Sequence, residues 1–290
     1  MSIIALSRIS KSFGDKTVLH GVDLEVGEGE MVGLIGASGS GKSTLIRMIC
    51  GLERMDRGTA GRIALFDKET QKDGRFSEHC EGLRREVGVI FQQFNLISRL
   101  SLLTNVLAGR LGRIPRWRGT TGLFPQSDKV KALRALERVG LIDQAHQRAS
   151  TLSGGQQQRG AIARVLTQEA RLILADEPIA SLDPASAKLV MSTLRQINRL
   201  DKTTVIVSLH QIDHAFEHCD RIIALKDGRV LHNGPTGGIS PDDIADLYGV
   251  EAGSLDLVKA RPAKPTGRPA YPGNGLAPQD DLAARVAVSV

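Results

Sequence analysis

One stretch decides the fold of this chain, and it reads MVGLI over residues 31–35, GASGSGKST over residues 36–44 and LIRMI over residues 45–49. An apolar run, a glycine-rich segment and a second apolar run predict a strand, a loop and a helix. The spacing fits G-x-x-x-x-G-K-[ST], in which glycines let consecutive backbone N–H groups surround phosphate oxygens at the positive end of the helix. The sequence therefore predicts a phosphate-binding loop in an α/β protein.

The side chains of this loop predict a nucleotide site. Lys42 has the reach for β- and γ-phosphates, and Ser43 offers a hydroxyl to Mg²⁺. Thr44 bonds an α- or β-phosphate or caps the start of the helix. The alternative is a glycine-rich turn with an incidental lysine, which the flanking strand and helix disfavour. The residues expected around the phosphates are Gly36, Ser38, Gly39, Ser40, Gly41, Lys42, Ser43 and Thr44.

Composition limits the classes of protein to which the chain belongs. With 290 residues, 41% hydrophobic and 24% charged, it is expected to form one large or two modest soluble domains. The formal net charge of +6 suits a nucleotide, lipid headgroups or nucleic acid, or reflects solvated basic side chains. Three separated cysteines, never in a C-x-x-C pair, indicate neither a disulfide framework nor a zinc site and favour a reducing cytoplasm. No apolar run approaches the ~20 residues of a membrane-spanning helix, so a membrane role would be peripheral.

The segments around the phosphate loop carry further expectations. Residues 3–35 alternate apolar and polar positions between glycines, which predicts short antiparallel strands. Phe13 lies in this region, and its ring would either stack on a purine or belong to the core. Residues 67–85 are polar and irregular, so they are expected to form a surface loop. Gln92 follows a short apolar strand, and its carboxamide would bind Mg²⁺ or position water.

The middle of the chain is expected to be helical. Leucines and valines recur at a helical period between residues 100 and 140. A basic loop, residues 113–119, interrupts this pattern and holds the single tryptophan of the sequence. This loop would contact lipid headgroups or a protein partner, or would simply expose its arginines around a half-buried indole.

Two later helix and strand ends carry polar residues suited to chemistry. Ser153 is a suitable N-terminal cap for a helix, and Gly154 and Gly155 leave backbone N–H groups accessible to an anion. An apolar strand over residues 172–175 leads into Asp176 and Glu177. In an α/β sheet this position suits catalytic acids, so Asp176 would hold Mg²⁺ through water and Glu177 would polarise the attacking water.

The last part of the chain continues the α/β pattern. A strand over residues 203–209 leads to His210, which would donate to a γ-phosphate. A metal site formed by His210, His214 and His218 on one helix face is the less favoured interpretation, because no glutamate stands beside His210 in an H-E-x-x-H pattern. We expect a hairpin over residues 221–231, a short helix over residues 242–248, and a mobile tail over residues 251–290.

Taken in order, these motifs resemble the ATP-binding subunits of ABC transporters over about residues 3–250. The resemblance implies a P-loop NTPase, RecA-like core with an antiparallel β subdomain and an α-helical subdomain at about residues 95–165. The ABC ATPase domain would span residues 1–250. In that family the matching positions are Phe13 for adenine, residues 36–44 for Walker A, Gln92 for the Q-loop, Ser153, Gly154, Gly155 and Gln156 for the signature, Asp176 and Glu177 for Walker B, Asp183 for the D-loop, and His210 for the switch histidine.

The resemblance also implies partners and an activity. Two copies would pack head to tail, so that the signature motif of one covers the ATP and Mg²⁺ of the other. Four segments resemble those of the ATPases of phosphonate importers, and an importer of a related oxyanion such as phosphite could share them. They are residues 91–96, 99–107, 109–112 and 208–213. Such an ATPase would bind two membrane permeases on the cytoplasmic face of the membrane and serve an external substrate-binding protein. An exporter, and a soluble ABC ATPase acting on nucleic acid or ribosomes, are the alternatives; nucleic acid is not an expected partner.

Overall fold

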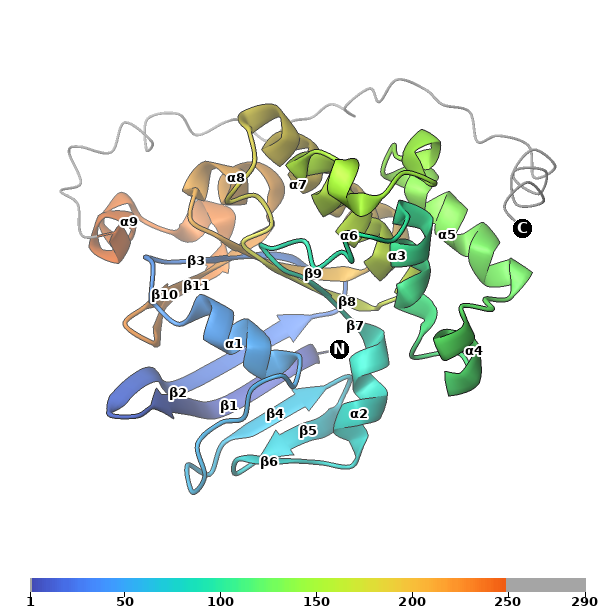
Figure 1. Cartoon of the computed structure of the whole chain (residues 1–290). Coiled ribbons are helices and arrows are strands. Elements are labelled where there is room, and N and C mark those ends of the chain that lie inside the picture. Colours follow the sequence, from blue (N-terminus) through green and yellow to red (C-terminus); the bar gives the residue numbers. More distant parts are fainter. Residues whose placement is uncertain (1, 249–290) are drawn as a thin grey trace. The chain divides into compact units, whose positions relative to one another are not determined.

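The computed structural model describes residues 2–248, which form two compact units, one of residues 2–93 and 169–248 and one of residues 94–168. The predicted tail, residues 251–290, lies outside the described residues. The first unit contains two sheets and the second is helical (Figure 1). Within the described part of the chain, no helix has the length and apolar character needed to cross a membrane.

The larger sheet of the first unit has the strand order β11-β10-β3-β9-β8-β7. Its strands are β3 (Met31–Ile35), β7 (Val87–Ile90), β8 (Leu172–Asp176), β9 (Thr204–Leu209), β10 (Arg221–Lys226) and β11 (Arg229–Pro235). Five of these strands run parallel, namely β3, β7, β8, β9 and β10, whereas β11 pairs antiparallel with β10. Strands β3, β8 and β9 are buried throughout, as expected for central parallel strands covered on both faces. The predicted hairpin is confirmed as β10 and β11.

Helices cover this sheet on both sides (Figure 1). Helix α1 (Lys42–Ile49) contacts β8 and also β2 (Lys16–Gly27) of the second sheet. Helices α7 (Pro184–Asp201) and α8 (Ile212–His218) pack against each other and against β9, and α8 also contacts β3. The predicted terminal helix is confirmed as α9 (Pro241–Tyr248), which follows the short turn η5 (Thr236–Gly238).

The second sheet is antiparallel, as expected from the alternation near the N-terminus. Its order is β2-β1-β4-β5-β6, with β1 (Ser2–Phe13), β2 (Lys16–Gly27), β4 (Arg62–Leu65), β5 (Lys68–Lys72) and β6 (Arg75–Phe76). Apolar side chains of β1, β2 and β4 form one core with α1 and β3. Helix α1 therefore joins the two sheets, and its first residues belong to the phosphate loop.

The prediction of a surface loop over residues 67–85 is wrong. This segment forms β5 and β6, then α2 (His79–Leu83) and η1 (Arg84–Glu86). Two adjacent polar side chains of β5, Thr70 and Gln71, are both buried, so the apolar alternation that reveals a strand is absent. Gln71 accepts a hydrogen bond from the Met55 N–H at 2.5 Å and donates to the Glu53 carbonyl at 3.2 Å. Tertiary hydrogen bonds thus satisfy a polar strand.

The second unit, residues 94–168, is made of helices. They are α3 (Leu102–Leu107), η2 (Ala108–Arg110), α4 (Arg116–Thr121), α5 (Gln126–Arg138), η3 (Ile142–Gln144), η4 (Ala149–Thr151) and α6 (Gly154–Gln168). Helices α3, α5 and α6 pack on one another. A buried ion pair joins Arg110 of η2 to Asp128 of α5 at 2.9 Å.

The basic segment over residues 113–119 is only partly a loop, because α4 begins at Arg116. Pro115 precedes the helix, where its missing N–H costs nothing, and Gly122 ends it in the left-handed conformation. The indole of Trp117 is 57% exposed on this helix.

Candidate active site

The topology of the larger sheet gathers the predicted catalytic side chains at one edge. Strands β3, β7, β8 and β9 are parallel, so their carboxyl ends face the same way. The phosphate loop follows β3, Gln92 follows β7, Asp176 ends β8 and His210 follows β9. Ligands of open α/β sheets bind at this edge.

Two glycines shape the loop between β3 and α1. At Gly36, where φ is 154°, a Cβ atom would lie 2.2 Å from the carbonyl oxygen of Leu225. At Gly41, where φ is 105°, it would lie 2.7 Å from the side chain of Leu19. No side chain caps the start of α1, and its first turn holds no acidic residue. The N–H groups there are available to an anion, which the helix dipole favours.

Lys42 is folded back over the loop. Its side chain is buried, and Nζ donates to the carbonyl oxygens of Gly36 at 2.8 Å and Ala37 at 2.9 Å. Burial lowers the pKa of Lys42, while the nearby carboxylates of Glu177 and Asp176 oppose that shift. The ammonium group is therefore held at the loop that is expected to surround phosphates.

A chain of hydrogen bonds connects the loop with the end of β8. The hydroxyl of Ser43 donates to Asp176 Oδ1 at 2.9 Å, and the hydroxyl of Ser208 donates to the same oxygen at 3.0 Å. Two oxygen ligands 2.9 Å apart match neighbouring positions of an octahedral Mg²⁺ ion, which are about 3 Å apart. Ser43 and Asp176 therefore fit the oxygen ligands that this ion prefers.

Glu177 is fixed by its neighbours on both sides. Its N–H donates to the hydroxyl of Ser208 at 2.8 Å, and its Oε1 lies 2.6 Å from Nε2 of His210. Its backbone is in the left-handed region, with φ of 51°, which is uncommon outside glycine and concentrates at functional sites. The arrangement presents a carboxylate beside an imidazole, which suits proton transfer from water.

The comparison with known protein families shows to which family this chain belongs. The family model described as "ABC transporter" matches residues 19–180, more than half of the chain. The chain belongs to the ABC transporter family.

Relatives of this family member are similar over most of their length. It is 54% identical to the phosphonates import ATP-binding protein PhnC of Stutzerimonas stutzeri, covering 90% of this chain and 96% of that protein. It is 56% identical to phosphonates import ATP-binding protein PhnC 1 of Pseudomonas aeruginosa, covering 86% and 90%. A solved dimeric ATP-binding cassette, in a post-hydrolysis state with ADP and Pi, is 33% identical with a TM-score of 0.69, covering 81% of this chain and 100% of that one. The predicted P-loop NTPase fold is thereby confirmed.

The remaining predicted residues of this ABC protein are distributed over both units. Phe13 is half exposed at the end of β1, with Lys11 Nζ 4.9 Å from the centre of its ring. Gln92 is exposed two residues after the end of β7. Asp183 caps α7 by accepting a hydrogen bond from the Ser186 N–H at 3.0 Å. Hydrogen bonds from Ser186 lower the pKa of the Asp183 carboxyl.

The predicted signature residues begin a helix of the second unit. The Gln156 N–H donates to Ser153 Oγ at 3.3 Å, and the Ser153 N–H donates to Gln156 Oε1 at 2.9 Å. This reciprocal capping box starts α6, and Gly154 and Gly155 form its first two residues. The predicted N-terminal cap at Ser153 is confirmed.

The structure corrects one arrangement that the sequence left open. His210, His214 and His218 do not share a helix face, because His210 lies before α8. His210 instead contacts Glu177, and its carbonyl oxygen accepts from the Tyr248 hydroxyl at 3.1 Å. His214 and His218 stay together on α8, with ring centres 6.1 Å apart.

Sequence reasoning missed Ser208 and Tyr248. Ser208 is fully buried at the end of β9, and its hydroxyl contacts both acidic residues of the site. A serine within a run of β-branched residues was the available signal. The sequence held no signal for Tyr248, because its hydrogen bond with His210 joins residues 38 positions apart.

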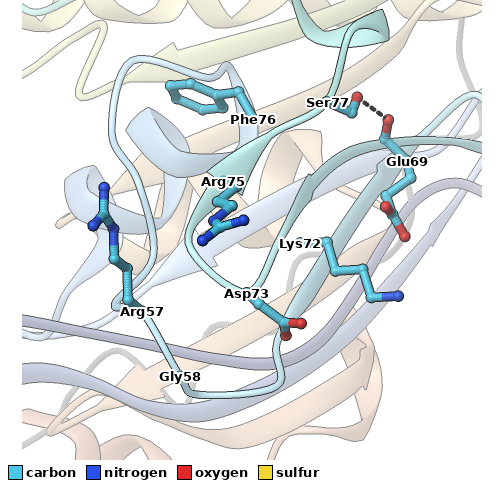
Figure 2. A pocket seen from close by; sticks show the side chains of 8 residues that line it. All are labelled: Arg57, Gly58, Glu69, Lys72, Asp73, Arg75, Phe76 and Ser77. Atoms are coloured by element: carbon cyan, nitrogen blue, oxygen red, sulfur yellow. Dashed lines mark hydrogen bonds between the residues drawn. The ribbon is translucent and has the colours of Figure 1, made fainter.

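A separate pocket of about 500 Å³ lies on the antiparallel sheet and shares no residue with this site (Figure 2). Three basic side chains, two carboxylates and the ring of Phe76 line it. Ser77 at its rim donates a hydrogen bond to the carbonyl oxygen of Glu69 at 2.5 Å. The mixed charge of this lining favours no single class of ligand.

Proposed function

We propose that this chain is the ATP-hydrolysing subunit of an ABC importer that carries phosphonates, or a related oxyanion such as phosphite, into the cell. Relatives that carry the printed name of phosphonate import proteins support the cargo. The observation that carries the activity is the continuous chain of hydrogen bonds from Ser43 through Asp176 and Ser208 to Glu177. It joins a phosphate loop to a carboxylate placed for activating water.

The nucleotide would bind between the loop and the first turn of α1. Backbone N–H groups of residues 36–44 and the ammonium group of Lys42 would contact its phosphates, and Phe13 would stack on the adenine. Ser43, Asp176 and Gln92 would hold Mg²⁺, which when bound neutralises charge on the phosphates.

Hydrolysis would depend on the pair formed by Glu177 and His210. The carboxylate of Glu177 accepts a proton from the attacking water, and Ser208 keeps the backbone of Glu177 in place. The imidazole of His210, 2.6 Å from that carboxylate, would orient it and would donate a hydrogen bond to the γ-phosphate. Precise positioning, more than covalent chemistry, accelerates phosphoryl transfer.

The complete site would need a second copy of the chain. Ser153, Gly154, Gly155 and Gln156 of one copy would cover the nucleotide bound by the other, and Asp183 would lie at this junction. The first turn of α6 suits this role, because its backbone N–H groups meet an anion favourably. The solved dimeric cassette is consistent with such a pair.

The dimer would work at the cytoplasmic face of the membrane. Two integral permease subunits would be its direct partners, and a substrate-binding protein outside the membrane its indirect one. Gln92 is exposed and belongs to the first unit, two residues before the second unit begins, and it would transmit closure of the dimer to the permeases.

The substitution Glu177→Gln tests the proposed ATP hydrolysis. Glu177→Gln should retain ATP binding and lower the hydrolysis rate by about 100-fold or more, because the proton acceptor is lost. Glu28→Gln, a change in an exposed pair with Arg171, is the matched control and should leave the rate unchanged. Hydrolysis by Glu177→Gln within a factor of two of the parent rate would contradict the assignment.

The cargo requires a separate experiment on the assembled transporter. ATPase activity should rise when the substrate-binding protein is loaded with a phosphonate, and phosphite and phosphate are tested in parallel. Stimulation by phosphate alone would contradict the phosphonate assignment and leave the ATPase assignment intact.

A further inference from the structure

Helix α8 carries a cluster of side chains that the proposed ATPase does not use. His214, Glu217 and His218 are spaced so that all three lie on one face of a helix. One potential ligand atom from each lies within 4.8 Å of those from the other two. Glu217 Oε2 is 3.7 Å from Nε2 of His218.

Two ring nitrogens of this cluster lack a hydrogen-bond partner among the described residues. His214 Nδ1 and His218 Nε2 are buried and form no hydrogen bond within the described residues. His218 is only 7% exposed. Buried polar atoms in proteins are nearly always hydrogen-bonded, so each exception calls for an explanation. A cation bound by these two nitrogens would give both of them a partner.

The charges around the cluster permit a cation. His218 is buried, and this burial lowers the pKa of its imidazole. Arg195, on the neighbouring helix α7, is already paired with Asp220 at 2.5 and 2.6 Å. Lys188 Nζ lies 3.9 Å from Glu217, but its side chain is 69% exposed and can turn away. The cluster then offers two imidazoles and one carboxylate.

We propose that His214, Glu217 and His218 bind a divalent transition-metal ion of the zinc class. Two imidazoles and a carboxylate are a ligand set that suits Zn²⁺, with water in the remaining position. The ion would clamp one turn of α8, the helix that begins two residues after His210 and packs on β3 and β9. The site is separate from the Mg²⁺ ligands, and it supplies no step of ATP hydrolysis.

Metal titration of the full chain tests this proposal. Tag-free protein is stripped with a chelator and titrated calorimetrically with Zn²⁺ in the absence of nucleotide, and its melting temperature is measured with and without Zn²⁺. The parent protein should bind one ion with high affinity and melt at a higher temperature when loaded, since the ion binds the folded state.

Single variants identify the ligands. His214→Gln and Glu217→Gln, neither at a fully buried position, should each weaken Zn²⁺ binding by at least the roughly 10–100-fold seen when outer-shell partners are lost. His79→Gln is the control, because His79 forms a similar pair with Glu78 at 3.9 Å on the surface but has no third ligand. Its affinity should equal that of the parent.

Circular dichroism and ATPase activity verify that each variant is folded. A parent protein without a one-to-one Zn²⁺ site would overturn the proposal. The proposal would also be overturned if His214→Gln and Glu217→Gln bound Zn²⁺ with the affinity of the parent, because the ion would then be bound elsewhere.

Discussion

At the scale of single residues, the active site depends on a hydroxyl group as much as on its carboxylates. Ser208 donates to Asp176 at 3.0 Å and accepts from the Glu177 N–H at 2.8 Å. It holds the two acidic residues in a fixed relation, and the left-handed backbone of Glu177 needs such support. The link between Asp176 and Glu177 therefore runs through the hydroxyl of Ser208.

Replacement of Ser208 should therefore affect both stability and catalysis. Ser208→Ala leaves the partly buried Glu177 N–H without its acceptor and should lower the free energy of unfolding by about 1–3 kcal/mol. The hydrolysis rate should fall more than ATP affinity does. Denaturant titration and steady-state kinetics measure the two effects.

Ser192→Ala is the matched control for that change. Ser192 donates only to the Lys188 carbonyl within α7, on an exposed part of the helix. Its loss should leave stability and activity nearly unchanged. An equal effect of the two substitutions would show that Ser208 has no special role.

At the scale of elements, a buried ion pair joins two segments of the helical unit. In the helical unit, Arg110 and Asp128 form an ion pair with side chains only 10% and 6% exposed. Removing one partner of a buried pair leaves the other charge uncompensated, which costs more than the pair itself contributes.

Asp128→Asn should destabilise the helical unit by about 3 kcal/mol. Hydrogen exchange should become faster in α3, α5 and α6, and denaturant titration should show the loss. Glu28→Gln, in an exposed pair, should cost less than about 1 kcal/mol. Equal stability of the two variants would contradict a structural role for the buried pair.

An ion pair between Arg195 of α7 and Asp220 before β10 gives a pH-dependent contribution. Hydrogen bonds from the Arg195 guanidinium lower the pKa of Asp220 below its ordinary value of 3.8. A lowered carboxyl pKa stabilises the fold above the unfolded value and ceases to do so as pH falls through the folded value.

Asp220→Asn should consequently be less stable than the parent at pH 7. The difference should narrow as the pH falls below about 3.8, when the parent carboxylate becomes protonated. Urea titrations across this pH range measure it. A difference that stays constant with pH would mean that packing, and not charge, links Asp220 to α7.

At the scale of the whole molecule, the proposed ATPase is a pair of chains, and its cysteines make that testable. The three native cysteines, Cys50, Cys80 and Cys219, are buried. Burial raises the pKa of Cys50 to about 11 and that of Cys219 to about 12, so these thiols react slowly at neutral pH. Ser38 and Ser153 are exposed, and each would accept a cysteine.

A chain with Ser38→Cys, Ser153→Cys and Glu177→Gln should form a disulfide-linked dimer under mild oxidation. ATP should increase the linked fraction severalfold, because nucleotide closes the pair and the glutamine prevents reopening. Non-reducing electrophoresis measures the product, and each single cysteine variant is a control. A yield independent of ATP, with ATP still bound, would contradict the head-to-tail arrangement.

Local chemistry in the sequence was sufficient for the phosphate loop, the ends of β8 and β9, the cap at Ser153 and the hairpin of β10 and β11. Each depends on neighbours along the chain: glycines for a tight turn, apolar runs for buried strands, a hydroxyl for a helix start. Residues 67–85 were mispredicted because Thr70 and Gln71 are satisfied by distant backbone groups.

The tertiary structure alone decided which of the polar residues meet. It separated His210 from His214 and His218, placed Ser208 between two carboxylates, and set Tyr248 beside His210. The order of parallel strands brings residues far apart in sequence to the same edge of the sheet, and side-chain hydrogen bonds form only after that edge is assembled. The sequence determined which functional groups are available, and tertiary packing determined which of them form hydrogen bonds with one another.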